Sequence, residues 1–281
     1  MKLKHLDLFS GIGGFSLGLE ATGGFETVAF CDIDQYPRQV LQKHWPHVKQ
    51  YEDIKELNYE KLKADGLLPI DIITGGYPCQ PFSVAGRKKG EDDPRHLWPE
   101  YFRLVKECRP TWVIGENVSG HIKLGLDTVI SDLESEDYAV RPFSISASSI
   151  GANHQRERVW IVANSRRPRG PWSELREENE NETRKENANQ FERSSSTPSS
   201  SANTNGKGSQ RYGSEYELRE SQEERKTSWS RWWESEPDVG RVAYGIPKRV
   251  DRLKSLGNSL VPQIPYYIGK TILEVMNGKT N

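Results

Sequence analysis

In the stretch Asp71-Ile72-Ile73-Thr74-Gly75-Gly76-Tyr77-Pro78-Cys79-Gln80-Pro81-Phe82-Ser83, a short apolar run passes into a loop rich in glycine and proline. Residues 71–74 predict a buried strand, and the glycines and prolines end it. Open α/β sheets bind ligands at the carboxyl ends of their strands, which is where this order places Cys79. A deprotonated thiol attacks well, so Cys79 is a candidate nucleophile. The alternative is a half-buried cysteine without function, since cysteine is among the most buried residue types.

The N-terminal segment predicts a second strand-to-loop passage. Residues 3–9 predict a strand, residues 10–14 a glycine-rich turn and residues 15–20 a helix. Such a turn lets a ligand approach the backbone, and the helix N-terminus favours negative charge. The next strand, residues 27–30, leads to Asp32, about 20 residues past the glycines, where an acidic side chain would hold a ribose hydroxyl. We expect Asp34 to cap the helix that follows.

Charged residues mark two later strands. Residues 111–114 predict a buried strand that residues 115–118 end, so Glu116 is expected at a strand end. A carboxyl group beside an apolar run can have a raised pKa and donate a proton, although a helix cap or surface acid is the alternative. Arg156 and Arg158 precede the strand at 159–163 and are expected to project to one face. They would bind a carboxylate, a phosphate or a base edge, or form a charge pair on an edge strand.

The alternation of strands and helices predicts an α/β fold, a doubly wound, mainly parallel Rossmann-like sheet with helices on both faces. A helix at 96–108, a strand at 138–146 and a closing helix at 263–276 complete it, and the last should dock near the first strand. Residues 173–230 hold few side chains that could build a core. We therefore expect a domain at 1–163, a small irregular insert at 164–240 and a C-terminal return at 241–281.

Composition narrows the class of protein. The chain has 281 residues and a net charge of -1, which argues neither for nor against nucleic acid. Its three cysteines are widely spaced, which fits a reducing compartment and neither a disulfide scaffold nor a metal site. No apolar run has the length of a membrane span or the form of a signal peptide. We expect a soluble cytoplasmic protein without a resident metal.

Five motifs occur in the order seen in C5-cytosine DNA methyltransferases, and the chain resembles that family in its bacterial or phage type. They are Asp7-Leu8-Phe9-Ser10-Gly11-Ile12-Gly13-Gly14, Pro78-Cys79-Gln80, Glu116-Asn117-Val118, Gln155-Arg156-Glu157-Arg158 and Gly257-Asn258-Ser259. The resemblance covers residues 1–163 and the C-terminal return. It implies that the insert at 164–240 is a target-recognition region, which is short and polar here, with Trp229–Trp233 as a possible DNA contact.

The resemblance implies S-adenosylmethionine as the methyl donor. It implies that the glycine-rich loop holds the donor, that Asp32 binds the ribose and that Ile33 packs on the adenine. It also implies that Asp53 and Ile54 meet the adenine and that Asn258 and Ser259 close the pocket. The implied cofactor-binding residues are Phe9, Gly11, Ile12, Gly13, Asp32, Ile33, Asp53, Ile54, Asn258 and Ser259.

The resemblance also implies the chemistry. The Cys79 thiolate would add to C6 of a flipped cytosine, and Glu116 would stabilise or protonate N3. Arg158 would hold the base or Glu116, with Arg156 in support. The residues implied on the substrate side are Pro78, Gln80, Ser83, Arg87 and Asn117, and the loop at 83–90 would close over the base.

The implied partner is double-stranded DNA, and a restriction endonuclease acting on the same site would accompany a restriction-modification or phage-protection role. We expect a monomer. A catalytically weak DNA-binding relative and a tRNA cytosine-C5 methyltransferase are the alternatives. A nucleotide-dependent oxidoreductase would explain the glycine loop and Asp32 but not Pro78-Cys79-Gln80. A zinc deaminase is excluded, because no Cys-x-x-Cys pair is present to hold the metal.

Overall fold

The computed structural model describes residues 2–78, 97–166 and 249–278, which belong to one compact unit. Its centre is a sheet in the order β3-β2-β1-β4-β5-β7-β6. Neighbouring strands are parallel except at β7, which is antiparallel to both β5 and β6. The strands are β1 (Leu3–Leu8), β2 (Phe25–Cys31), β3 (Lys49–Tyr51), β4 (Ile72–Gly75), β5 (Trp112–Val118), β6 (Tyr138–Ile145) and β7 (Arg158–Ser165). The predicted doubly wound, mainly parallel α/β fold is confirmed.

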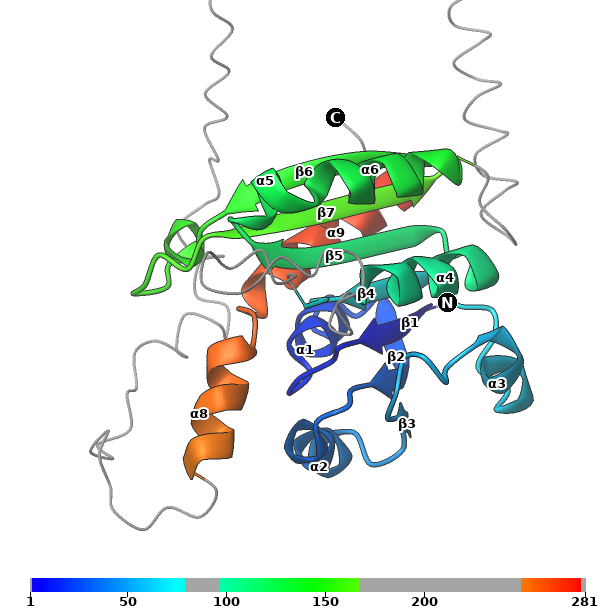
Figure 1. Ribbon diagram of the computed structural model, residues 1–281, viewed down its shortest axis with the longest axis horizontal. Coiled ribbons are helices and arrows are strands. Elements are labelled where there is room, and N and C mark those ends of the chain that lie inside the picture. The colour runs from blue at the N-terminus through cyan, green and yellow to red at the C-terminus, as the bar shows by residue number, and fades with distance from the viewer. Residues whose placement is uncertain (1, 79–96, 167–248, 279–281) are drawn as a thin grey trace, which may run out of the picture. The chain divides into compact units, whose positions relative to one another are not determined.

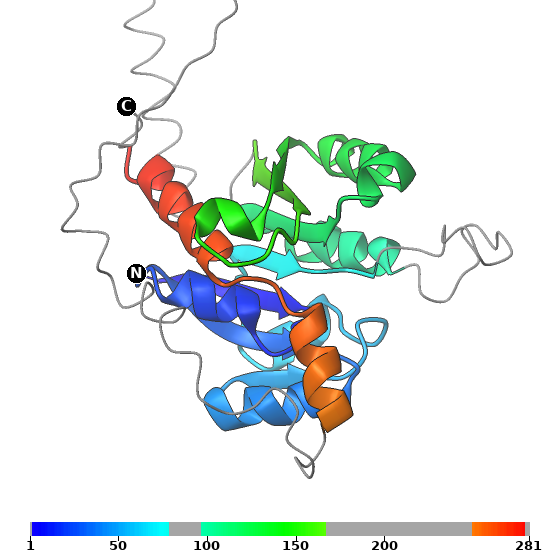
Figure 2. The ribbon, with the colours of Figure 1, turned by 90° about the vertical axis from the view of Figure 1, so that its left-hand side faces the viewer.

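Helices cover both faces of the sheet, as Figures 1 and 2 show. On one face lie α1 (Gly14–Glu20), α2 (Gln35–His44) and α9 (Gln263–Met276). On the other lie α3 (Tyr59–Ala64), α4 (Trp98–Cys108) and α6 (Leu126–Ser135). α5 (His121–Leu124), the 3-10 helix η2 (Ala147–Ile150) and α8 (Arg249–Asn258) lie in the connections. Within the described residues, no helix has the length and apolar character needed to cross a membrane.

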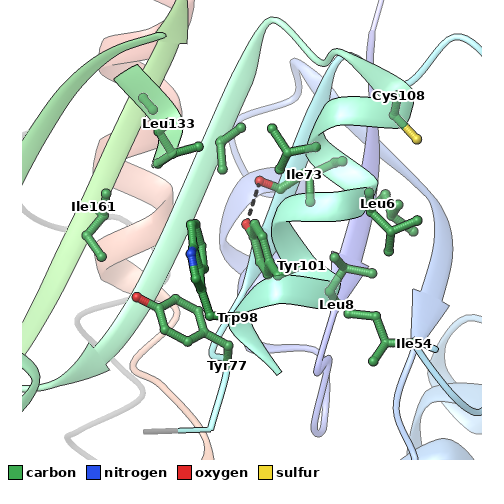
Figure 3. Close-up of a cluster of buried hydrophobic side chains, with 14 of the residues drawn as sticks. Leu6, Leu8, Ile54, Ile73, Tyr77, Trp98, Tyr101, Cys108, Leu133 and Ile161 are labelled. Atoms are coloured by element: carbon green, nitrogen blue, oxygen red, sulfur yellow. Dashed lines mark hydrogen bonds between the residues drawn. The ribbon is translucent and has the colours of Figure 1, made fainter. Parts of the chain in front are cut away.

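The larger core lies between the sheet and α4 (Figure 3). Leu6 and Leu8 of β1 and Ile73 of β4 alternate with residues that face the other side, as expected for strands covered on both faces. Tyr101 is fully buried among them, and its hydroxyl donates to the carbonyl oxygens of Ile73 (3.3 Å) and Ile114 (3.1 Å). These two bonds tie α4 to β4 and β5.

The closing helix α9 has the predicted bounds, and it packs on α1, the helix that follows the first strand. The contact is close because α1 presents a glycine. A Cβ atom at Gly18 would lie 2.2 Å from the carbonyl oxygen of Pro262. The C-terminal return is thereby fixed beside the N-terminal strand.

Three local predictions were wrong. β5 continues to Val118, because β7 runs antiparallel beside it and pairs with it through the Val118–Arg158 pair. Asp34 begins α2, but its side chain forms no capping hydrogen bond and pairs with Lys254 instead. β7 begins one residue before and ends two residues after the strand that was expected at 159–163. Most of the expected insert at 164–240 lies outside the described residues, so its boundaries stay a prediction.

A buried polar network joins β1, β2, β4 and α1. The Asp7 carboxyl group is fully buried and accepts hydrogen bonds from the Ser16 hydroxyl (2.7 Å) and the Thr74 hydroxyl (3.3 Å). The ring of His5, also fully buried, bonds Thr74 (2.7 Å) and Thr27 (3.1 Å). Burial raises the pKa of Asp7 to about 8 and lowers the pKa of His5 to about 3.

Exchange of Asp7 for asparagine is expected to change how stability depends on pH. Folded Asp7 holds its proton up to about pH 8, whereas its ordinary pKa is 3.8, so between these values the folded state binds more protons. Asp7 therefore makes the free energy of unfolding fall by about 1.4 kcal/mol per pH unit as pH rises. An asparagine side chain does not titrate, so the difference between wild type and D7N should have this slope in urea titrations at pH 5, 6 and 7. The contribution of His5 cancels in that difference, and parallel pH dependences would contradict the prediction.

Candidate active site

A pocket of about 410 Å³ opens where the parallel strands end. Phe9 follows β1, Asp32 follows β2 and Gly76 follows β4, while the last residues of β5 complete that wall. α8 also lines the pocket, through Lys254, Ser255, Gly257 and Asn258. Carboxyl ends of parallel strands meet at one edge of a sheet, which is why side chains distant in sequence gather here.

The glycine loop contributes two residues to the pocket lining. Phe9 and Gly11 line the pocket, and both have positive φ angles, 50° and 52°. Gly11 tolerates this conformation at no steric cost. Ile12 and Gly13, also predicted to bind the cofactor, are not among the lining residues. A Cβ atom at Gly13 would lie 2.8 Å from the Trp45 ring, so Gly13 serves the packing of α1 against α2.

Asp32 stands at the predicted ribose position. Its carboxylate accepts the backbone N–H of Gly11 (2.7 Å) and that of Asp34 (2.8 Å), which fixes its orientation toward the glycine loop. Burial raises the pKa of Asp32, and the two N–H donors oppose that shift. The neighbouring Ile33 is 71% exposed in the pocket wall. An oriented carboxylate beside an exposed apolar side chain suits a sugar hydroxyl joined to a flat apolar ring.

Of the other residues that were predicted to bind the cofactor, three line the pocket and one does not. Asp53 lines the pocket and accepts the N–H of Lys55 (2.9 Å), whereas Ile54 lines it but is only 4% exposed. Asn258 lines the pocket from the end of α8. Ser259 is not among the lining residues, and its hydroxyl donates to the carbonyl oxygen of Leu256 (3.0 Å).

Glu116 lies in the pocket wall on β5, with its side chain 13% exposed. The Arg158 Nε atom lies 3.1 Å from its Oε1 atom. Burial raises the pKa of Glu116, while the charges of Arg158 and Arg156 act in the opposite direction. A carboxyl group whose pKa is raised keeps its proton to a higher pH than an exposed glutamate and can share it with a bound base.

Arg156 and Arg158 were expected to project to one face of a strand, but Arg156 is not part of the strand. It precedes β7 in a left-handed conformation, φ 33°, so the strand period does not apply to it. Its guanidinium donates to the carbonyl oxygens of Gly257 (2.8 Å) and Ser259 (2.6 Å). Both arginines nevertheless line the pocket. Arg156 therefore connects the wall that carries Glu116 to the segment that carries Asn258.

Of the predicted substrate contacts, Pro78 and Asn117 are described, and both line the pocket. Asn117 is buried, its amide N–H donates to the Tyr77 carbonyl oxygen (3.1 Å), and its oxygen accepts the Val118 N–H (2.9 Å). Its polar atoms thus hold the strand ends in place. Cys79, Gln80, Ser83 and Arg87 lie outside the described residues, as does Trp229–Trp233.

The comparisons agree with this geometry. The model of the C-5 cytosine-specific DNA methylase family matches residues 3–246. The chain belongs to this family. The type II methyltransferase M.HgiCII of Herpetosiphon aurantiacus is 38% identical over 167 residues, which are 57% of this chain and 37% of that protein.

Two further relatives of this methylase chain bear on its length. The type II methyltransferase M.HhaI of Haemophilus parahaemolyticus is 33% identical over 165 residues, 57% of this chain and 48% of that protein. A solved DNA modification methyltransferase encoded within an E. coli prophage is 34% identical, with a TM-score of 0.51 over 58% of this chain and 47% of its own. The methylase chain thus spans less than half the length of these relatives.

Two contacts at the pocket were not predicted. Lys254 of α8 pairs with Asp34 (2.8 Å) across the pocket, and both residues line it. The Tyr77 hydroxyl lies 2.9 Å from Nε2 of His121. Neither pair has a local sequence signal, because the partners are 220 and 44 residues apart. Among the described residues, no group of three histidine, cysteine or acidic side chains could hold a metal ion.

Proposed function

We propose that the chain carries the catalytic centre of a DNA (cytosine-5-)-methyltransferase that takes its methyl group from S-adenosylmethionine. One observation carries the proposal. Glu116, buried and paired with Arg158, lines the same pocket as Asp32 and Ile33, and Pro78, whose carbonyl carbon is bonded to Cys79, stands in its wall.

The described pocket fits the proposed donor. The Asp32 carboxylate is an acceptor for ribose hydroxyls, held in place by the Gly11 N–H, and the exposed Ile33 side chain offers an apolar surface to adenine. Asp53 lies in the same wall as a further acceptor for the nucleoside. When bound, S-adenosylmethionine supplies an electrophilic methyl group.

The proposed reaction begins at Cys79, whose thiolate adds to C6 of the cytosine. The added electron density reaches C5, which bonds the methyl carbon as the bond between that carbon and the donor's sulfur breaks and S-adenosylhomocysteine leaves. Loss of the C5 proton to solvent and cleavage of the C6–sulfur bond would then release the methylated base and restore the thiolate. This sequence makes Cys79 a covalent catalyst whose bond to the base forms and breaks in each turnover.

Glu116 would act at N3 of the same ring. A proton held by its carboxyl group stabilises the negative charge that builds on the ring when the thiolate adds. Burial raises the pKa of Glu116, which favours the protonated form that this step needs. Arg158, whose Nε atom lies 3.1 Å from Oε1, would orient the carboxyl group and pair with the carboxylate that remains once the proton has moved to N3.

The proposed substrate is double-stranded DNA, from which the cytosine must be flipped at a cost of a few kcal/mol. The relatives' designation as type II methyltransferases supports a restriction-modification role beside an endonuclease that acts on the same site. A monomer in the cytoplasm accords with this role.

Arg156 is proposed to hold the C-terminal wall of the donor site. Exchange of Arg156 for glutamine removes its charged donor to the carbonyl oxygens of Gly257 and Ser259, between which lies Asn258. Hydrogen bonds from charged groups contribute about 1.5–3 kcal/mol, so we expect the Kd for S-adenosylmethionine to rise by about tenfold or more. Isothermal titration calorimetry measures this. R141Q, at an exposed position on β6, is the control, and an unchanged Kd in R156Q would contradict the role.

The direct test is transfer of labelled methyl groups from S-adenosylmethionine into unmethylated genomic DNA, with tRNA in a parallel reaction. Bisulfite sequencing should then show 5-methylcytosine in one short sequence context of the DNA. Label in tRNA alone would assign the same chemistry to RNA. Donor binding without transfer to either nucleic acid would indicate a catalytically weak relative and contradict the proposal.

A further inference from the structure

We propose that His121 is a positioning residue for the nucleophile, because its hydrogen bond with Tyr77 holds residues 76–78, which directly precede Cys79 in the chain, beside Glu116. The inference rests on the proposed function. Tyr77 precedes Pro78 and Cys79 in the chain, and His121 is the first residue of α5, just after β5.

The bond is buried and direct. Tyr77 is 3% and His121 is 6% exposed, and the Tyr77 hydroxyl lies 2.9 Å from His121 Nε2. The two rings meet edge to face at 5.4 Å between centroids. Tyr77 also packs on Trp98 (Figure 3), with 5.1 Å between the ring centroids. A buried tyrosine hydroxyl requires a polar partner, and the imidazole nitrogen provides it.

Two further contacts tie the same turn to the Glu116 strand. The Asn117 amide donates to the Tyr77 carbonyl oxygen at 3.1 Å. A Cβ atom at Gly76 would lie 3.1 Å from Glu116 Oε2, so the backbone of the turn passes directly beside the carboxyl group. Together with the His121 bond, these contacts hold Tyr77 by its main chain and by its side chain.

The imidazole is itself held in place. A Cβ atom at Gly125, the residue after α5, would lie 2.9 Å from His121 Cε1, so only glycine leaves space for the ring there. Burial lowers the pKa of His121, which keeps the ring neutral and able to share a proton with the tyrosine hydroxyl. Of the two residues, Tyr77 is among those that line the pocket, so the role proposed for His121 is to position Tyr77.

The arrangement separates positioning of the nucleophile from binding of the donor. Tyr77 and His121 lie at the ends of β4 and β5, whereas Asp32 and Ile33 follow β2. Misplacement of a reacting group by about 1 Å can cost about 100-fold in rate. Loss of the hydrogen bond should therefore lower kcat without changing the KM for S-adenosylmethionine.

The test compares Tyr77→Phe, His121→Leu and the double variant with the wild type. We expect each single variant to lower kcat by about tenfold or more at unchanged donor KM. The double variant should be no slower than the slower single one, because both remove the same bond. His121→Gln, whose amide can still meet the hydroxyl, should recover part of the loss. Wild-type kcat in both single variants, or losses that multiply in the double variant, would overturn the inference.

Two measurements keep the outcome interpretable. Tyr138→Phe is the control, because it removes another buried hydroxyl, which donates to the Pro110 carbonyl oxygen at 2.7 Å. Neither Tyr138 nor Pro110 is among the residues that line the pocket. Melting temperatures should fall no further in the Tyr77 and His121 variants than in this control. If the kcat losses instead follow the melting temperatures across all variants, the inference fails.

A second readout needs no DNA. The rate at which iodoacetamide alkylates Cys79, measured by peptide mass spectrometry, reports on how the preceding turn presents the thiol. Cys31 and Cys108 are buried, with thiol pKa values raised to about 12, so they should react slowly. The Cys79 rate should change in Tyr77→Phe and His121→Leu but not in Tyr138→Phe. Absence of methyl transfer by the wild type would refute the proposed function alone, whereas an unchanged alkylation rate would refute the positioning role.

Discussion

Exchange of Cys79 for alanine is expected to reduce methyl transfer to the uncatalysed background while the Kd for S-adenosylmethionine stays at its wild-type value. The thiolate alone can form the bond to C6 that makes C5 nucleophilic, and alanine offers no substitute. The donor contacts proposed for Asp32 and Ile33 follow a different strand, β2, and should not change. Labelled transfer and calorimetric titration of the donor measure the two effects separately.

Cys108→Ala is the matched control for this substitution. Cys108 ends α4 in the core, is 7% exposed, and has a thiol pKa raised to about 12 by burial. Its loss should leave turnover intact. Measurable turnover in C79A, or equal losses in both alanine variants, would contradict a covalent role for Cys79.

Exchange of Glu116 for glutamine is expected to lower kcat by about 10²–10⁴-fold, the usual contribution of a positioned acid or base. Glutamine keeps the shape of the side chain but has no proton to give to N3 and no charge for Arg158 to pair with. Donor binding should remain. E157Q is the control, because the Glu157 carboxylate accepts a hydrogen bond from Ser144 and is not among the pocket residues.

The pH profile adds a signed test of the Glu116 role. Burial raises the pKa of Glu116, so its acid form persists to higher pH than for an exposed glutamate. Wild-type kcat should fall as pH rises through that pKa, since the proton needed at N3 is lost. E116Q should lack this limb. A profile of the same shape in both proteins would assign the limb to another group.

Much of the site could be predicted because it depends on local order along the chain. Each of β1, β2 and β4 passes directly into its functional residues, and parallel strands bring those residues to one edge. Asp32 and Glu116 could therefore be located from the strand pattern. The exposure of Ile33 follows from the same position, just beyond the end of β2.

The remaining contacts depend on pairings between segments that the chain does not place near each other. Arg156 reaches carbonyl oxygens more than 100 residues later, at Gly257 and Ser259. The bonding of Tyr77 to His121 depends on how β4 and β5 align, which no single segment encodes. β5 is longer than its apolar run because an antiparallel neighbour supplies backbone partners for Glu116 and Asn117.

The central claim is that Cys79 bonds to C6 of a cytosine held against Glu116. Its most direct test uses DNA of random sequence in which 5-fluorocytosine replaces cytosine, incubated with S-adenosylmethionine and the wild-type chain. Fluorine cannot leave C5 as a proton does, so the base should stay attached to the protein after methylation. We predict a denaturant-resistant complex that maps to Cys79 by peptide mass and is absent in C79A. An adduct at another residue, or no adduct from a protein that methylates ordinary cytosine at C5, would contradict the account.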